Sequence, residues 1–377
     1  MERKNSEKPG QKIINWLRLS IIDLYIIRKF LGTFVFSIIL ILSIAVVFDF
    51  SEKIDDFIEN GAPYQAIIYD YYLNFIPYFA VLFSSLFTFI SVIFFTSKMA
   101  SNTEIIAILS SGISLNRLLK PYMISATLIA IFSFVMSDYV IPKSNSKKID
   151  FEEKYIHKRP VSFDQTNIHR QIEPGIFIYI ERYSNYSMTG SNFSIEKFEE
   201  GQLVSKLISD EIRWDSTKNK WTIKRYYVRD YDSIRESVTE GATIDTTLRL
   251  KPSEFARRPN IVETMSLSEL REFIKEAKMK GETNIVSYQI ERYKRIAFPF
   301  ATYILTIMGL SVSVRKVRGG IGMHLGIGMG LSFTYILFMQ FSSQFSIGGA
   351  MPPQIAVWLP NIIFAVVALV LYTKAPK

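Results

Sequence analysis

The chain has 377 residues, a formal net charge of +9 and 49% apolar residues, and it contains no cysteine. The absence of cysteine excludes disulfides and thiolate chemistry, and the basic residues do not form the stripe typical of nucleic-acid binding. Between Gly319 and Thr373 there is no Asp, Glu, Lys or Arg. Soluble helices show a polar face to water, whereas a charge at the centre of a bilayer is costly, so this pattern predicts a membrane protein.

The chain begins with a basic leader, residues 1–29, which we expect to lie in the cytoplasm or at the membrane interface. No cleavable signal sequence is evident in it. The segment Ile13–Ile27 has two readings of equal weight: an amphipathic helix on the membrane surface, or an extension of the first spanning helix. The basic residues of the leader are Arg3, Lys4, Lys8, Lys12, Arg18, Arg28 and Lys29.

Apolar runs of spanning length come in two groups of three, which predicts six transmembrane helices. The long charge-free stretch exceeds the roughly 20 residues of one crossing. The turn sequence Ser346–Pro353, rich in Gly and Pro, divides it into two spans. The expected spans are Phe30–Phe48, Tyr72–Phe95, Pro121–Ile141, Ile296–Val314, Ile321–Phe341 and Ile355–Tyr372.

The charges of the short connections predict the orientation, because Lys and Arg are enriched in cytoplasmic loops. The connection after the first span is acidic, with Lys53 as its one basic residue. The connections after spans two and four and the C-terminal tail are basic, like the leader. Both termini are therefore expected in the cytoplasm and the large block between spans three and four outside. The basic residues of these loops are Lys98, Arg117, Lys120, Arg315, Lys316, Arg318, Lys374 and Lys377.

The external block, residues 143–265, is expected to be rich in β-strands. Ile176–Ile180 is a short apolar run after Pro174-Gly175, and Trp214–Trp221 has the sequence of a hairpin turn. Several strands at such spacing suggest a sandwich or barrel. A helical connector, residues 266–295, follows, because Ser266 and Glu269 fit a capping box and Gly281 is a helix stop.

The chain lacks the motifs of an enzyme. It has no phosphate-binding Gly-rich loop and no Gly-x-Ser-x-Gly elbow, and His157, His169 and His324 lack metal-ligand spacing. Asp70 and Asp138 lie at span ends, where solvation explains them, so an ion-coupled carrier is disfavoured.

Two other features point to a function. Residues 101–112 predict a short cytoplasmic helix with an N-cap and a Gly stop, and its apolar face suits either packing on the membrane surface or docking to a cytoplasmic partner. The fifth span is rich in glycine, which permits close helix packing and equally a helix that shifts against its neighbour.

At these residues the chain resembles the LptF/LptG family of lipopolysaccharide export permeases. The likeness covers nearly the whole length. Ile22–Leu31 looks like the family's entry into the first span, Asn102–Gly112 is similar to its coupling helix, and Pro299–Gly309 with Gly319, Gly320 and Gly326 resembles its fourth and fifth spans. The compactness of the β domain favours an LptG-like over an LptF-like chain.

The resemblance implies a six-helix membrane protein, three plus three (residues 30–142 and 296–377), with an inserted periplasmic jellyroll-like all-β domain and short helices after it. Two such permeases would form a V-shaped cavity, and lipopolysaccharide would enter between spans one and five of opposing subunits. The implied partners are a cytoplasmic ABC ATPase dimer, a second permease of the family, a single-span periplasmic jellyroll protein and a periplasmic bridge. The chain itself would carry no cofactor, with ATP and Mg in the ATPase, and would lie in the bacterial inner membrane.

Site residues follow from the matching motif positions. The family's motif carries the ATPase contact over to Glu104, with neighbours on the same short helix. The lipid gate is carried over more weakly, because family members can have several lysines where span one leaves the membrane and Lys53 stands alone there. The expected coupling residues are Asn102, Glu104, Ile105, Ile108, Leu109 and Gly112. The expected gate and headgroup residues are Lys53, Gly322, Gly326 and Gly330.

Two rival hypotheses remain open at this point. A mechanotransmitting ABC membrane subunit would relay ATPase motion without moving lipid, although such chains have fewer spans. A membrane-anchored scaffold or sensor would need no contact with an ATPase, so the docking helix separates it from a transporter.

Overall fold

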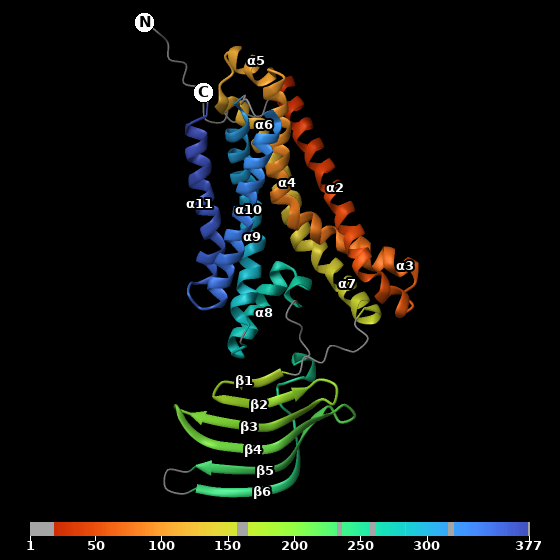
Figure 1. The fold of residues 1–377 in the computed structure, drawn as a ribbon. Coiled ribbons are helices and arrows are strands. Elements are labelled where there is room, and N and C mark those ends of the chain that lie inside the picture. Colours follow the sequence, from red (N-terminus) through yellow and green to blue (C-terminus); the bar gives the residue numbers. More distant parts are fainter. Residues whose placement is uncertain are drawn as a thin grey trace. The chain divides into compact units, whose positions relative to one another are not determined.

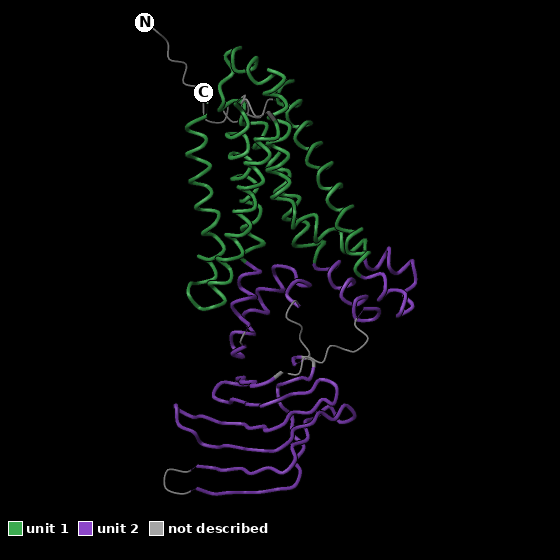
Figure 2. The backbone as a smooth tube through the Cα atoms, in the orientation of Figure 1, with its two compact units in different colours: residues 1–52, 72–141, 293–377 green, residues 53–71, 142–292 purple. Residues whose placement is uncertain are grey.

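The computed structural model describes residues 19–156, 165–231, 236–255, 261–282, 284–315 and 320–375. The chain divides into two compact units (Figure 2). A helical unit comprises residues 1–52, 72–141 and 293–377, and a second unit comprises residues 53–71 and 142–292 and contains the sheet.

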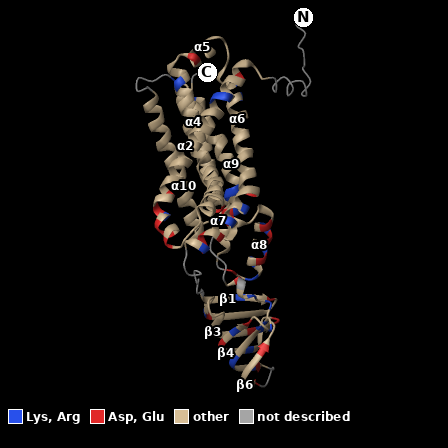
Figure 3. Ribbon diagram, turned by 90° about the vertical axis from the view of Figure 1, so that its right-hand side faces the viewer, with Lys and Arg blue, Asp and Glu red and all other residues tan. Residues whose placement is uncertain are grey.

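The described part of the chain contains six helical stretches long and apolar enough to cross a membrane, three before the sheet and three after it, as the sequence predicts (Figure 1). Charged residues gather near the ends of these helices and are sparse between (Figure 3). The first three stretches are α2 (Ile21–Glu59), α3–η1–α4 (Tyr64–Ala66, Ile67–Tyr72, Leu73–Ser101) and α6–η2–α7 (Leu115–Val135, Met136–Val140, Ile141–Tyr155). The last three are α9 (Ile285–Ser313), α10 (Gly320–Ile347) and α11 (Pro353–Thr373).

The helices extend beyond the apolar runs that predict them. α2 begins at Ile21, so for Ile21–Ile27 the helix-extension reading is confirmed, while residues 13–18 lie outside the described residues. The third stretch continues through η2 into α7, so the prediction of β structure from residue 143 is wrong for Lys143–Tyr155. Alternating charges support this extra helix, since Lys148 and Glu152, one turn apart, lie 3.7 Å from each other.

The helices of the bundle differ in how far they are buried by the rest of the chain. Within the most apolar window of each stretch, 50% of the residues are buried in α4 and 56% in α9, but 11% in α2 and 22% in α10. α4 and α9 therefore form the centre of the bundle. α2 and α10 leave most of their apolar surface for lipid or another subunit, because side chains of this kind are not left facing water.

The sheet of the second unit is a single antiparallel meander of six strands, in the order β1 to β6. Within the described residues it is one open sheet, not the two-sheet sandwich or closed barrel that strand spacing suggests, because each strand pairs with its sequence neighbour and β1 does not pair with β6. The strands are β1 (Gln165–Glu173), β2 (Ile176–Ser184), β3 (Thr189–Glu199), β4 (Gln202–Asp215), β5 (Lys220–Tyr231) and β6 (Glu236–Thr246).

The hairpin predicted at Trp214–Trp221 is confirmed: these two residues face each other across β4 and β5, and their rings lie 5.2 Å apart. Trp221 is fully buried, and its indole N–H donates to the Leu250 carbonyl at 2.8 Å. Phe255 also packs in this core. The segment after β6 therefore closes over one face of the sheet and supplies the partner that a buried indole needs.

The connector after the sheet forms α8 (Leu267–Met279), as predicted. The Glu269 carboxylate accepts from the Ser266 backbone N–H at 2.8 Å, which completes the expected capping box and lowers the pKa of Glu269. Gly281 follows the helix with a φ of +67°, a conformation that glycine adopts without strain.

Candidate functional site

A short helix, α5 (Glu104–Ser110), joins α4 to α6 at the end of the bundle where the C-terminus lies (Figure 1). Thr103 before it and Gly112 after it both have positive φ, 63° and 88°. The glycine stop is thus confirmed. The predicted side-chain N-cap is wrong, because Ser101 belongs to α4 and Thr103 makes no capping hydrogen bond to α5. The two sharp turns set α5 apart from the long helices on either side.

The inner face of α5 packs on its own chain. Ile105 is fully buried, and Ile108 and Leu109 are partly buried against the same cluster, which also contains Met99 and Leu115. Burying one such side chain is worth about 1.5–3 kcal/mol. These three predicted coupling residues therefore anchor α5 to the bundle.

The outer face of α5 exposes an isoleucine, Ile106, which lies within the Ile105–Leu109 segment expected around the Glu104 contact. Ile106 is 45% exposed, and Ala107 and Ser110 are exposed beside it. Asn102, just before the helix, and Gly112, just after it, are exposed as well. Ile105, Ile108 and Leu109 share one helical face, and Ile106 lies outside it.

Glu104 is half-buried, and both of its carboxylate oxygens accept hydrogen bonds. The Tyr25 hydroxyl donates to one oxygen at 2.9 Å, and the Asn102 amide donates to the other at 3.3 Å. Tyr25 belongs to α2, so the first residue of α5 is tied directly to the first spanning helix.

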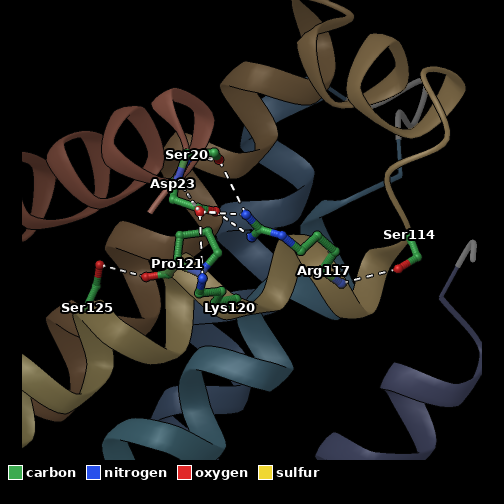
Figure 4. A network of polar contacts seen from close by, with 7 residues as sticks. All are labelled: Ser20, Asp23, Ser114, Arg117, Lys120, Pro121 and Ser125. Atoms are coloured by element: carbon green, nitrogen blue, oxygen red, sulfur yellow. Dashed lines mark hydrogen bonds and ion pairs between the residues drawn. The ribbon is translucent and has the colours of Figure 1, made fainter. Parts of the chain in front are cut away.

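A second contact fixes α2 at the same end of the bundle (Figure 4). The Asp23 carboxylate receives two hydrogen bonds from the Arg117 guanidinium, each 2.6 Å long. The Ser20 backbone N–H donates to it at 2.8 Å, and the Lys120 ammonium lies 4.0 Å away. Asp23 and Lys120 are buried, with side-chain exposures of 2% and 5%. Arg117 and Lys120 lie in the first turns of α6, so this network joins the starts of two spanning helices.

The glycines of α10 fall into two groups. A Cβ added at Gly322, Gly326 or Gly330 would meet no other atom of the described chain within 4 Å. A Cβ at Gly328 would collide with Ile93 of α4. The three predicted gate glycines thus lie on surface open to a partner or a lipid, and Gly328 permits close packing inside the bundle.

Lys53 lies in the second unit and is engaged by its own chain. Its ammonium contacts the Tyr71 hydroxyl and lies 3.7 Å from the Glu152 carboxylate. It also lies 4.8 Å from the centre of the Tyr71 ring. The carboxylate partly neutralises the one basic residue expected to face the lipid headgroup.

No group of three metal-ligating side chains occurs among the residues that the structure describes. The His169 and Tyr179 rings lie 4.6 Å apart and are tilted by 39°, and His324 contacts Ser97 between two helices. His157 lies outside the described residues.

Two groups of three apolar helices, an inserted antiparallel sheet and a short helix on one connecting loop define a multi-pass membrane protein of the permease kind. The family model for lipopolysaccharide export system permease LptF/LptG matches residues 24–374, and the chain belongs to this family. The model covers LptF and LptG together and does not separate them. Comparison with curated proteins finds no match.

Membership in this family makes the chain a permease component of lipopolysaccharide export, a multi-pass inner-membrane protein that works within the Lpt complex. As the permease component, it is itself non-catalytic.

Proposed function

We propose that this chain is one of two permease subunits that extract lipopolysaccharide from the outer leaflet of the inner membrane and pass it to a periplasmic bridge. A separate cytoplasmic ABC ATPase dimer, with its own ATP and Mg, drives the extraction. Both termini and α5 lie in the cytoplasm, and the sheet lies in the periplasm, where a single-span jellyroll protein receives the lipid.

The outer face of α5 is the observation that carries this proposal. Ile105 anchors the helix from within, and Ile106 exposes an apolar side chain on the outer face beside Ala107 and Ser110. An exposed apolar side chain on a firmly anchored helix is what an interface needs at its centre. Glu104 at the start of the helix adds a carboxylate for a basic residue of the ATPase.

The low burial of α2 and α10 supports the position of the lipid gate. These two helices, spans one and five, have the smallest buried fractions among the six described stretches. Gly322, Gly326 and Gly330 have no side chains, so they leave the backbone of α10 uncovered on its open surface. A lipid or the matching helix of the second permease can therefore approach the α10 backbone closely.

The test of the ATPase contact is the variant Ile106→Asp in the assembled complex. A charge at the centre of an apolar contact is costly, so we expect the ATPase to be lost from the purified complex while the permease itself folds normally. Ile208→Asp in the sheet is the matched control, because Ile208 is also 45% exposed. Retention of the ATPase by Ile106→Asp at the level of the control would refute the contact.

The role of Lys53 in headgroup binding is tested by Lys53→Glu. We expect weaker stimulation of ATPase activity by lipopolysaccharide, because the substitution repels phosphate groups. Lys148→Glu is the matched control, since Lys148 also lies 3.7 Å from Glu152. Unchanged stimulation in Lys53→Glu, or equal loss in both variants, would remove Lys53 from the lipid site.

A further inference from the structure

A buried hydrogen bond joins α4 to α10 close to the start of α5. The Ser97 hydroxyl and the Nδ1 atom of His324 lie 2.6 Å apart. Both residues are buried, with 3% and 4% of their surface exposed. Ser97 lies one turn before Ser101, the last residue of α4, and His324 lies near the start of α10.

The surroundings make this contact hard to exchange for another. The second ring nitrogen of His324, Nε2, is buried and has no hydrogen-bond partner in the described chain. Breaking the bond to Ser97 would leave the imidazole with no partner at all in an apolar bundle, where water does not compensate the loss.

Close packing continues the contact along both helices. Gly328, one turn beyond His324, lets α10 approach Ile93 of α4. Further along, Phe89 and Ile93 of α4 share one apolar cluster with Tyr335 and Met339 of α10. The two helices are therefore in close contact along this whole seam.

We propose that the Ser97–His324 hydrogen bond transmits movement of α5 to the gate helix α10, which makes His324 a positioning residue for lipid extraction. The inference rests on the proposed function. Only Asn102 and Thr103 separate α4 from α5, so a push on α5 displaces the end of α4 that holds Ser97. The face of α10 that carries Gly322 and Gly326 meets no other part of the described chain and is free to shift.

The test uses the assembled transporter in liposomes and measures lipopolysaccharide released per ATP hydrolysed. For Ser97→Ala and His324→Gln we expect this ratio to fall about five-fold or more, the lower end of typical coupling between sites, with ATP hydrolysis retained. His324→Asn places an amide near the Nδ1 position and should keep the ratio, whereas the longer glutamine places it near Nε2. Ser343→Ala is the matched control, because Ser343 is a buried serine of α10 whose hydroxyl, within the described residues, donates to the Met339 carbonyl of its own helix.

A disulfide between the two positions gives a second measurement. The chain has no cysteine, so Ser97→Cys combined with His324→Cys introduces the only pair. We expect the oxidised pair to transport as the unsubstituted chain does, because the two helices move together. Arrest of transport on oxidation would overturn the proposal, since α4 and α10 would then have to separate.

The outcomes separate this inference from the function on which it rests. A normal ratio in Ser97→Ala, or an equal fall in Ser343→Ala, would overturn the role of the hydrogen bond and leave the transporter assignment intact. Absence of ATP-driven lipid release from the unsubstituted complex would refute the proposed function, and the inference would fall with it.

Discussion

The contacts of Asp23 hold the start of α2, and their contribution to the stability of the protein can be predicted from the structure. Asp23→Asn keeps the shape of the side chain and an acceptor for the Ser20 N–H, but it removes the charge that faces Arg117 and Lys120. Breaking a buried ion pair from one side costs about 3–5 kcal/mol. Because the Arg117 side chain is 41% exposed, water recovers part of this energy, and we expect a loss of about 2–3 kcal/mol. At about 2–4 °C per kcal/mol, the midpoint of thermal unfolding should fall by about 4–12 °C.

A double-mutant cycle isolates the Asp23–Arg117 contact from other effects of the substitution. Asp23→Asn, Arg117→Gln and the double variant are purified in detergent, and their thermal midpoints are followed by intrinsic fluorescence. We expect a coupling energy of about 2 kcal/mol. Either single substitution already removes both 2.6 Å hydrogen bonds, so the double variant loses no further contact between the two residues. A coupling energy below about 0.5 kcal/mol would refute the view that this pair fixes the start of α2.

Three further predictions concern packing. Gly328→Leu should abolish the monodisperse peak in size-exclusion chromatography, because the side chain would collide with α4, whereas Gly326→Leu should purify normally; equal yields would contradict the division of the α10 glycines. Trp221→Phe leaves a buried carbonyl without its donor and should lower the stability of the sheet by about 1–3 kcal/mol, seen as earlier loss of β-type circular dichroism on heating. Ile105→Ala should destabilise the bundle by about 2–5 kcal/mol and Ile106→Ala by less than about 0.5 kcal/mol; similar thermal shifts would contradict the assignment of the two faces of α5.

Features set by neighbouring residues could be predicted from the sequence. The six spans follow from the length of apolar runs, and the Trp214–Trp221 hairpin follows from a polar turn between two aromatic residues. The capping box at Ser266 is likewise a local pattern. The sequence also indicated the short helix of residues 101–112, although it did not show which face packs inward.

Features set by residues far apart could not be predicted in the same way. Asp23 and Arg117 are separated by 94 positions, and nothing in either local pattern indicates that they meet. The contact between Ser97 and His324 spans 227 positions and depends on how α4 packs against α10. The end of an apolar run does not mark the end of its helix: residues 143–155 continue the third stretch as α7, where Lys148 and Glu152 pair one turn apart, so the prediction of β structure there is wrong.

The most direct test of the export function is mass spectrometry of proteins and lipids that copurify with the tagged chain from its native membrane. If the chain extracts lipopolysaccharide as proposed, an ABC ATPase, a second permease of the LptF/LptG family and lipopolysaccharide should be recovered in one complex. Recovery of the ATPase without lipopolysaccharide would contradict lipid extraction and favour a mechanotransmitting subunit. Absence of any ATPase, even after cross-linking at Glu104, would contradict the transporter assignment and favour a membrane-anchored scaffold.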